Sequence, residues 1–240
     1  MIGLLKPPGA RGRIGVIQPA PGVMIEYEWP KWLPSDVLFP VGRMRMPSAD
    51  RAGYAEMAAV APAVAQDLAS AGAGVIAYAC TLGSIYAGAK AEADLTAALA
   101  AASGKPAISL GEASIEALRQ LGARRLLIMT PYSKEINTWV ADYALEAGFD
   151  VLATLGTPVG IAEIGEYGPA AIHKLSVEAL SAHPRADALW LPCTAIQTLE
   201  AIDAVETDSG RCVVSGSQAL LWGALRLLKL AGSGPGRLFA

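Results

Sequence analysis

Two cysteines stand at matching places in the two halves of this sequence. Cys80 and Thr81 follow the apolar run 74–79, and Cys193 and Thr194 follow the apolar run 187–191. The two cysteines are 113 positions apart, close to half of the 240 residues. A thiol donates a proton when neutral and attacks as a nucleophile when ionised. Two thiols placed alike therefore predict a site with a nucleophile on one face of a substrate and a proton donor on the other.

The segments around the cysteines predict strands that alternate with helices. Apolar runs predict strands at 13–18, 37–41, 74–79, 106–110, 125–130, 150–154, 187–191 and 212–215. Helical spacing and helix-stopping glycines predict helices at 54–71, 87–102, 113–121, 134–147, 169–182, 195–205 and 218–230, with a Gly-rich loop at 155–168. Such alternation is typical of right-handed βαβ units and parallel sheets. Both cysteines then lie at carboxyl ends of strands, where open α/β sheets bind their ligands.

The two halves also repeat in detail. The strand 106–109 precedes a helix with Ala117-Leu-Arg119, and the strand 212–215 precedes one with Ala224-Leu-Arg226. The sequence therefore predicts an α/β fold of two pseudo-symmetric Rossmann-like halves, each a parallel sheet flanked by helices, with a crevice between them. We expect residues 1–115 to form the first half and 116–216 the second, with the C-terminal helix 217–240 packing back on the first.

Each cysteine also has a plainer interpretation. A single Cys is usually a buried structural residue, and this alternative applies to Cys80 and Cys193 taken one at a time. The matched placement favours chemistry, and backbone N–H groups of the loop after Cys80 are expected to lower the pKa of its thiol. Cys212 lies inside the strand 212–215, and we interpret it as a core residue.

Other catalytic classes find no support. His173 and His183 lie in a helix and at a helix exit and read as surface residues, which disfavours Cys-His and Ser-His-Asp hydrolases. The sequence has no GxSxG, no P-loop and no GxGxxG after its first strand. It has no CxxC pair either, so neither a metal nor an organic cofactor is predicted.

Composition limits the partners and the compartment. Hydrophobic residues make up 53% and charged residues 17% of the chain, and the net charge is −3 with a pI near 5.5. No nucleic-acid partner is predicted, because a basic surface is missing. The mean hydropathy of +0.38 raises the question of a membrane protein, but no apolar run has the length of a spanning helix. An odd number of cysteines and no evident signal peptide predict a reducing cytoplasm, and a homo-oligomer is compatible with the sequence.

Polar residues after two further strands suggest carboxylate binding. Tyr132 follows the strand 125–130, and its hydroxyl would suit a substrate carboxylate, although a packing role at the rim is the equal alternative. Asn137 lies one turn further on and is a weaker candidate. Arg43 and Arg45 follow the second strand; one guanidinium would suit a carboxylate, but a surface ion pair or subunit contact is the simpler expectation.

Several strings resemble the aspartate/glutamate racemase superfamily, in particular its branch with maleate cis–trans isomerase and arylmalonate decarboxylase. The resemblance runs from Arg13 to Leu238. It rests on Ile17-Gln-Pro19, Arg43-Met-Arg-Met46, Ala77-Tyr-Ala-Cys80-Thr, Leu121-Gly-Ala-Arg-Arg, Thr130-Pro-Tyr132, Cys193, Ala201-Ile-Asp-Ala-Val-Glu206 and Val213-Val-Ser215. Thr81-Leu-Gly-Ser-Ile-Tyr86 and Gly160-Ile-Ala-Glu163 resemble the decarboxylase.

The resemblance implies a cofactor-independent enzyme and roles for individual residues. Cys80 matches the isomerase nucleophile, where the decarboxylase has glycine, and Cys193 matches the proton-transferring cysteine. The implied substrate-binding residues are Pro19, Thr81, Tyr132, Asn137 and Thr194. One position departs from the isomerases: Gly22 stands where their Asn holds a substrate carboxylate. Maleate is therefore in doubt as the substrate, unless Arg43 or the loop 155–168 supplies the missing donor.

The sequence therefore predicts a cofactor-independent isomerase or racemase of a small carboxylate or dicarboxylate, similar to maleate isomerase. Cys80 would be the nucleophile and Cys193 the proton donor. One alternative is an arylmalonate-type decarboxylase that protonates an enediolate with Cys193. A second, from another class, is a carboxylate-binding protein without turnover.

Overall fold

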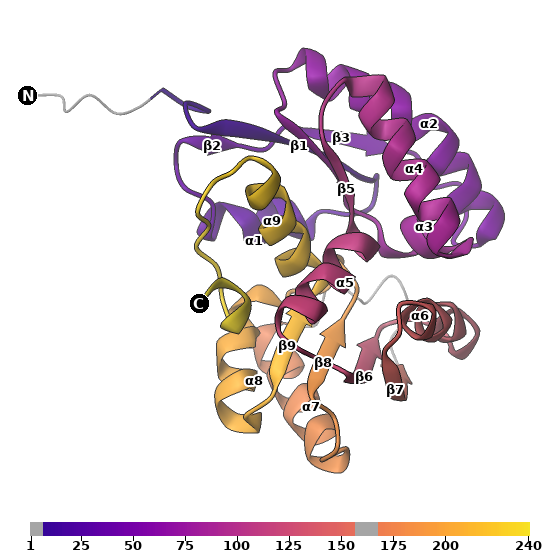
Figure 1. The fold of residues 1–240 in the computed structure, drawn as a ribbon, viewed down its shortest axis with the longest axis vertical. Coiled ribbons are helices and arrows are strands. Elements are labelled where there is room, and N and C mark those ends of the chain that lie inside the picture. The colour runs from indigo at the N-terminus through magenta and orange to yellow at the C-terminus, as the bar shows by residue number, and fades with distance from the viewer. Residues whose placement is uncertain (1–6, 157–167) are drawn as a thin grey trace, which may run out of the picture.

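Two parallel sheets form the framework of the protein, one from each half of the chain (Figure 1). The structure is a computed structural model that describes residues 7–156 and 168–240. The first sheet contains β1 (Gly12–Pro19), β2 (Val37–Leu38), β3 (Val41–Met44), β4 (Val75–Tyr78) and β5 (Ala107–Ser109). The second contains β6 (Arg125–Thr130), β7 (Asp150–Gly156), β8 (Ala188–Leu191) and β9 (Cys212–Ser215). The predicted fold class is confirmed.

Helices cover the sheets and connect their strands. In the first half these are α1 (Met24–Glu28), the 3-10 turn η1 (Trp29–Lys31), α2 (Arg51–Ser70), α3 (Thr81–Ile85), α4 (Gly88–Ser103) and α5 (Leu110–Gln120). The second half has α6 (Lys134–Glu146), α7 (Pro169–Ala182), the 3-10 turn η3 (Leu199–Ala201), α8 (Ile202–Ser209), α9 (Gly216–Leu227) and the 3-10 turn η4 (Arg237–Phe239). Side-chain caps begin several of them; Asp50 accepts from the Gly53 N–H at 2.8 Å and so begins α2.

The strand orders of the two sheets correspond. The first sheet runs β2-β1-β4-β5, with β3 pairing the outer edge of β1, and the second runs β7-β6-β8-β9. In each sheet the chain goes from the inner strand to one edge and then crosses to the other side. The reversal points lie between β1 and β4 and between β6 and β8. Ligand sites of open α/β sheets form at such points, and both cysteines follow a strand that borders one.

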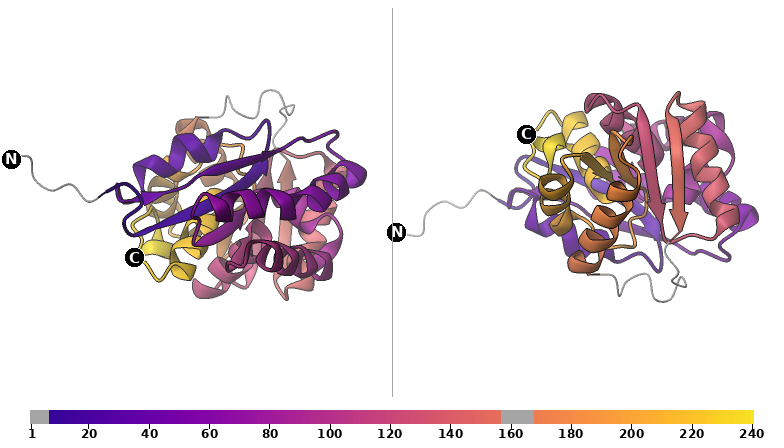
Figure 2. Two further views of the ribbon diagram at one scale, coloured as in Figure 1. Left: turned by 90° about the horizontal axis from the view of Figure 1, so that it is seen from above. Right: turned by 90° about the horizontal axis from the view of Figure 1, so that it is seen from below.

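The end of the chain packs against the first half. Helix α9 packs on α5 and contacts β4 and β5, and Figure 1 shows α5 and α9 side by side between the two sheets. The Ser233 hydroxyl donates to the Trp32 carbonyl at 3.2 Å, and both views of Figure 2 show the yellow C-terminal segment beside the indigo first half. The division into halves at 115 and 216 stays a prediction.

The local predictions need two corrections. The segment Val41–Met44 forms strand β3, because it pairs with the last four residues of β1 after the short β2 ends. The helix predicted at 195–205 begins later, at η3 and α8, and residues 194–198 form a loop. The predicted loop 155–168 falls largely outside the described residues, apart from the end of β7 and Gly168. Within the described residues, no helix is long and apolar enough to cross a membrane.

Candidate active site

Cys80 lies at the point where strand β4 gives way to helix α3. It is the N-cap residue of this five-residue helix, and its sulfur accepts a hydrogen bond from the Gly83 N–H at 3.3 Å. Its side chain is 8% exposed. The next residues, 81–85, are all buried, so the thiol sits on a short helix that is itself embedded in the protein. A backbone N–H aimed at the sulfur is a donor for a thiolate.

Cys193 lies at the equivalent end of β8 but in a different local structure. It follows Pro192 and is 4% exposed, and its sulfur accepts from the Ala195 N–H at 3.4 Å. The Tyr132 hydroxyl also donates to it. No helix begins at Cys193; the chain continues as a loop until Thr198. Cys193 is therefore held by a side chain from another strand end as well as by its own backbone.

The buried carboxylate of Glu28 fixes the far end of the Cys193 loop. Glu28 ends helix α1 of the first half and is 1% exposed. Its Oε1 accepts from the Thr198 N–H at 2.6 Å and from the Leu199 N–H at 2.7 Å. Burial raises the pKa of this carboxyl, against the lowering effect of the two backbone donors. Sequence patterns did not reveal this residue, because its partners are 170 and 171 positions away.

Two contacts join the cysteine-bearing strand ends. The Thr81 hydroxyl, next to Cys80, donates to the Pro192 carbonyl, next to Cys193. Tyr132 forms side-chain hydrogen bonds with both Cys193 and Thr81. Thr81 is 2% exposed, so this bridge is shielded from water. The two thiols are also close enough for Cys193 to perturb Cys80 electrostatically. The sequence-predicted residues Cys80, Thr81, Tyr132 and Cys193 thus form one cluster between the two sheets.

Burial controls the protonation of both thiols. Desolvation raises the pKa of Cys80 to about 12, with the Gly83 N–H opposing the shift and the charge of Cys193 adding to it. Desolvation likewise raises the pKa of Cys193, against the hydrogen bond from Tyr132. The loop N–H groups of Gly83 and Leu82 lower the pKa of Cys80, as expected, but the loss of water around the sulfur outweighs them and the net shift is upward.

Two tyrosines that the sequence analysis did not single out belong to this neighbourhood. Tyr54 of α2 is 3% exposed; burial raises the pKa of its hydroxyl, and both cysteines raise it further. Tyr78, the last residue of β4, is fully buried; burial raises the pKa of its hydroxyl most, and Cys80 raises it further. Tyr78 stands two positions before Cys80, which places the two side chains on one face of the strand.

The remaining predicted substrate-binding residues surround this cluster. Pro19 ends β1, which is the neighbour of β4 in the sheet, and it is half-buried; Thr194 follows Cys193 and is half-buried as well. Asn137 is 7% exposed, and its amide is engaged: Oδ1 accepts from the Thr130 hydroxyl and Nδ2 donates to the Tyr132 carbonyl at 3.4 Å. Asn137 therefore holds the backbone of Tyr132 in place.

An open cavity of about 360 Å³ lies next to Tyr132. Its described lining residues are mostly polar: Tyr132, Lys134, Asn137, Thr138, Ala141, Thr154 and Gly156. They come from the start of α6 and the ends of β6 and β7. Tyr132 lines this cavity and also bonds Cys193 and Thr81, so the cavity borders the cluster on its Tyr132 side.

The position of Arg43 bears on the missing carboxylate donor. Its guanidinium donates to the carbonyls of Ala20 (2.9 Å) and Gly22 (2.5 Å) and pairs with the Glu26 carboxylate. Glu26 also accepts from Gln18 Nε2 at 2.8 Å. Arg43 thus braces the loop 19–22 from outside, and its donors are used within the protein. Arg43 and the loop 155–168 were the two candidates to replace the carboxylate-binding Asn of the isomerases. The guanidinium of Arg43 is already bound to other groups of the protein.

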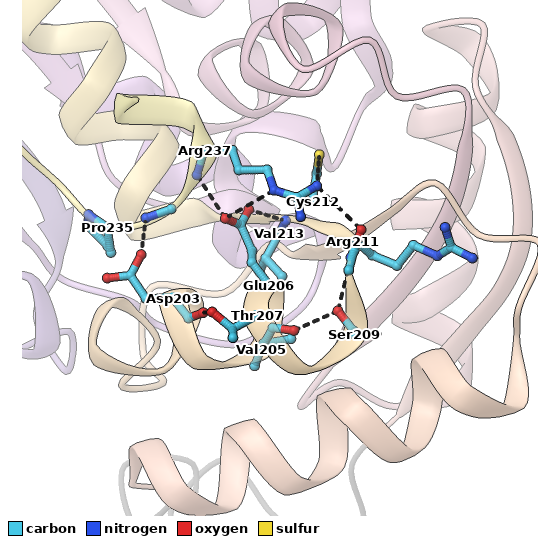
Figure 3. Close-up of polar contacts among 12 residues, drawn as sticks. Asp203, Val205, Glu206, Thr207, Ser209, Arg211, Cys212, Val213, Pro235 and Arg237 are labelled. Atoms are coloured by element: carbon cyan, nitrogen blue, oxygen red, sulfur yellow. Dashed lines mark hydrogen bonds and ion pairs between the residues drawn. The ribbon is translucent and has the colours of Figure 1, made fainter.

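The third cysteine lies at the amino-terminal ends of the strands of the second sheet, whereas Cys193 lies at their carboxyl ends. Cys212 begins β9 and pairs with Ala188, the first residue of β8, whereas Cys193 follows the last residue of β8. Cys212 is half-buried, and so less enclosed than a core residue, because it stands at the start of its strand. Figure 3 shows its thiol beside Arg237, at 3.7 Å from Nη1, near the Glu206 carboxylate.

The histidines and acidic residues add no metal centre to the site. His173 pairs with Asp208 at 2.8 Å, and His183 lies 2.8 Å from the Ala179 carbonyl; both are partly exposed. Among residues 7–156 and 168–240, no group of three or more His, Cys, Asp or Glu side chains is arranged to hold a metal ion.

The fold and the paired thiols define a class of α/β proteins with one cysteine from each of two similar halves. The family model for arylmalonate decarboxylase matches residues 14–239, and the chain belongs to this family. Arylmalonate decarboxylase of Bordetella bronchiseptica is 31% identical over 230 residues, covering 94% of this chain and 95% of that one.

Two solved structures extend the comparison. One is an arylmalonate decarboxylase mutant, in its liganded form, in which a glycine is replaced by cysteine and a cysteine by serine. It is 32% identical with a TM-score of 0.86 and covers 95% of this chain and 98% of its own. The other is a mutant of the Nocardia farcinica maleate cis-trans isomerase with a covalently bound succinylcysteine intermediate. It is 28% identical with a TM-score of 0.83 and has the same coverage.

Proposed function

We propose that the protein is a cofactor-independent isomerase or racemase of a small carboxylate or dicarboxylate, with Cys80 as nucleophile or base and Cys193 as proton donor. One observation carries this proposal: two buried thiols at equivalent strand ends, joined through Thr81 and Tyr132. The succinylcysteine trapped in the Nocardia isomerase supports it, because a thioether to a four-carbon diacid is what thiolate addition to a cis-enedioate produces.

For an enedioate substrate the proposed steps are addition, rotation and elimination. The proton of Cys80 leaves to solvent, and the thiolate forms a C–S bond with one alkene carbon. The electron pair of the double bond moves into the adjacent carboxylate as an enediolate, which takes a proton from Cys193. The former double bond now rotates. Return of that proton to Cys193 and cleavage of the C–S bond then release the trans acid.

For a substrate with a proton next to its carboxylate, the same two thiols would racemise it. One cysteine, as thiolate, removes the α-proton from one face, and the other donates a proton to the opposite face of the enediolate. In both reactions negative charge develops on a carboxylate. The proposed donors to that carboxylate are the hydroxyls of Thr81, Tyr132 and Thr194, with Pro19 and Asn137 completing the surroundings of the substrate.

The second candidate function is decarboxylation of an arylmalonate-type substrate. Membership of the arylmalonate decarboxylase family favours it, as does the Tyr132 hydrogen bond that makes Cys193 a supported proton donor. Cys80 disfavours it, because the decarboxylase has glycine at that position. In this reaction carbon dioxide leaves and Cys193 alone protonates the enediolate, so Cys80 would be dispensable.

The test is turnover in deuterated water followed by ¹H NMR. Maleate, aryl- and alkylmalonates, aspartate, glutamate and hydantoins would be incubated with wild type, Cys80→Ala and Cys193→Ala. Isomerisation or α-deuterium exchange that needs both thiols supports the proposal. Decarboxylation that survives Cys80→Ala selects the second candidate. Binding of these acids without any turnover would identify a carboxylate-binding protein and remove both enzyme proposals.

The proposal also includes the surroundings expected from the sequence. Free thiols at a working site require a reducing compartment, so we propose a cytoplasmic location. A homo-oligomer is part of the same proposal, and light scattering of the purified protein would test it.

A further inference from the structure

The hydroxyl of Tyr78 lies beside the Cys80 sulfur but makes no hydrogen bond within the described residues. The residue is fully buried at the end of β4. Its hydroxyl finds no hydrogen-bond partner among the residues that the structure describes. A buried hydroxyl without a partner is destabilising, so such a group calls for an explanation.

Gly83 shows where this hydroxyl points. A Cβ atom added to Gly83 would lie 2.6 Å from the Tyr78 hydroxyl oxygen and 3.0 Å from the Cys80 sulfur. The hydroxyl and the sulfur therefore flank the same point on helix α3, and only a residue without a side chain leaves that point open. The Gly83 N–H already donates to the sulfur at 3.3 Å.

We propose that the Tyr78 hydroxyl is a side-chain hydrogen-bond donor for the Cys80 thiolate, left without a partner while Cys80 is a neutral thiol and satisfied when the thiolate forms. A neutral thiol is a weak acceptor, whereas a thiolate is a strong one. A donor that gains its partner only in the charged state favours the reactive state over the resting state. This inference rests on the proposed role of Cys80 as nucleophile or base.

The proposal explains a conflict within the site. Burial makes the thiolate of Cys80 costly, and the backbone N–H groups of Gly83 and Leu82 do not compensate for it. A buried hydroxyl beside the same point of α3 needs only a local adjustment to donate to the thiolate and stabilise it. Cys193 receives the corresponding bond from Tyr132, so each thiol has one tyrosine of its own.

The test is alkylation of Cys80 by iodoacetamide between pH 8 and 10.5, followed by mass spectrometry. The background is Cys193→Ala with Cys212→Ala, which leaves Cys80 as the only cysteine. Tyr78→Phe keeps the ring and removes only the hydroxyl. We expect alkylation roughly tenfold slower at each pH below the pKa of the thiol, the effect of one lost charge-assisted hydrogen bond. Tyr86→Phe, a hydroxyl removed nearby, is the matched control with the parent rate.

Urea unfolding of the same variants separates this role from a structural one. We expect Tyr78→Phe to unfold at or above the urea midpoint of the parent, because the lost hydroxyl has no partner in the resting protein. A loosened structure would label faster, so slower labelling cannot come from loosening. An unchanged alkylation rate, or a lower midpoint with faster labelling, overturns the proposal. Labelling needs no substrate, so it decides the role of Tyr78 even if every substrate fails and the proposed function falls.

Discussion

The two cysteine ends of the molecule have the same place in the topology but different local structures. Cys80 caps a short buried helix and accepts a hydrogen bond from the Gly83 N–H of that same helix. Cys193 lies in a loop that is held by Tyr132 from β6 and, further along, by Glu28 from the first half. The Cys80 end is therefore built from local contacts, and the Cys193 end depends on contacts across the two halves.

This difference suits two different tasks. A nucleophile must be directed at one atom, and a rigid helix N-terminus positions it. A proton donor must lose and regain its proton, and a tyrosine hydroxyl beside it stabilises the thiolate left behind. The two strand ends are equivalent in the topology, and the segments that follow the strands make them unequal.

Removal of each thiol is expected to give the largest effect. Cys80→Ala and Cys193→Ala should each lose at least about a hundredfold in isomerisation or racemisation, the usual contribution of an acid–base group. Initial rates by NMR in deuterated water would measure this. Cys212→Ala is the control. This variant should keep the activity of wild type, because the Cys212 thiol lies at the opposite end of the strands from Cys193. Full activity in Cys80→Ala would mean that the two ends are not partners in catalysis.

Glu28 tests whether the Cys193 end depends on the first half. Glu28→Ala leaves the N–H groups of Thr198 and Leu199 without their buried acceptor and should destabilise the protein by roughly 2–4 kcal/mol. Urea denaturation would measure the free energy of unfolding. Glu28→Gln keeps an acceptor oxygen and should lose less. Equal stability in both variants and wild type would show that the loop holds itself in place.

Gly22, in the turn after β1, tests substrate choice. A Cβ at Gly22 would lie 3.3 Å from the Pro19 carbonyl oxygen and 3.5 Å from Gln18 Oε1, so Gly22→Asn needs only a small adjustment. A donor to a buried carboxylate contributes about 1.5–3 kcal/mol, so this variant should raise maleate kcat/KM roughly ten- to a hundredfold. Wild type is expected to be a poor maleate isomerase. Efficient wild-type turnover, unchanged in Arg43→Ala, would disprove our interpretation of Gly22.

Alkaline pH tests the burial of Cys80. Burial raises the pKa of this thiol from its ordinary value near 9.0 to about 12, so the fold favours the neutral thiol. The resulting stability is complete below pH 9 and is lost as the pH rises toward 12, by about 1.4 kcal/mol per unit. The free energy of unfolding should therefore fall more steeply for wild type than for Cys80→Ala between pH 9 and 10.5. Parallel curves would indicate a solvated thiol.

Chelation of metal ions should leave the activity, and so both cysteine ends, unchanged. Neither cysteine belongs to a metal-binding cluster within the described residues, and the proposed chemistry uses thiols and hydroxyls only. Activity before and after EDTA treatment, with divalent ions added back, would measure this. Loss on chelation and recovery with an ion would require a different mechanism.

The sequence by itself determined the sheets, the halves and the strand ends. Apolar runs of four to eight residues between helix-forming segments can be read locally, and the matched positions of Cys80 and Cys193 follow from them. The resemblance assigned Thr81 and Tyr132 to the site, and both lie within three residues of a strand end, after β4 and β6. Strand β3 was missed because it is formed by pairing with β1 and not by its own composition.

Tertiary structure alone decided what surrounds the thiols. The Thr81–Pro192 bridge joins residues 111 positions apart, and Glu28 reaches Leu199 over 171. The pKa of Cys80 shows the same limit. The lowering effect of the loop N–H could be predicted from the sequence, but the larger rise from desolvation depends on everything packed around the sulfur. Tyr54 and Tyr78 stand in a helix and a strand with no motif to mark them, and only the packing places their buried hydroxyls near the thiols.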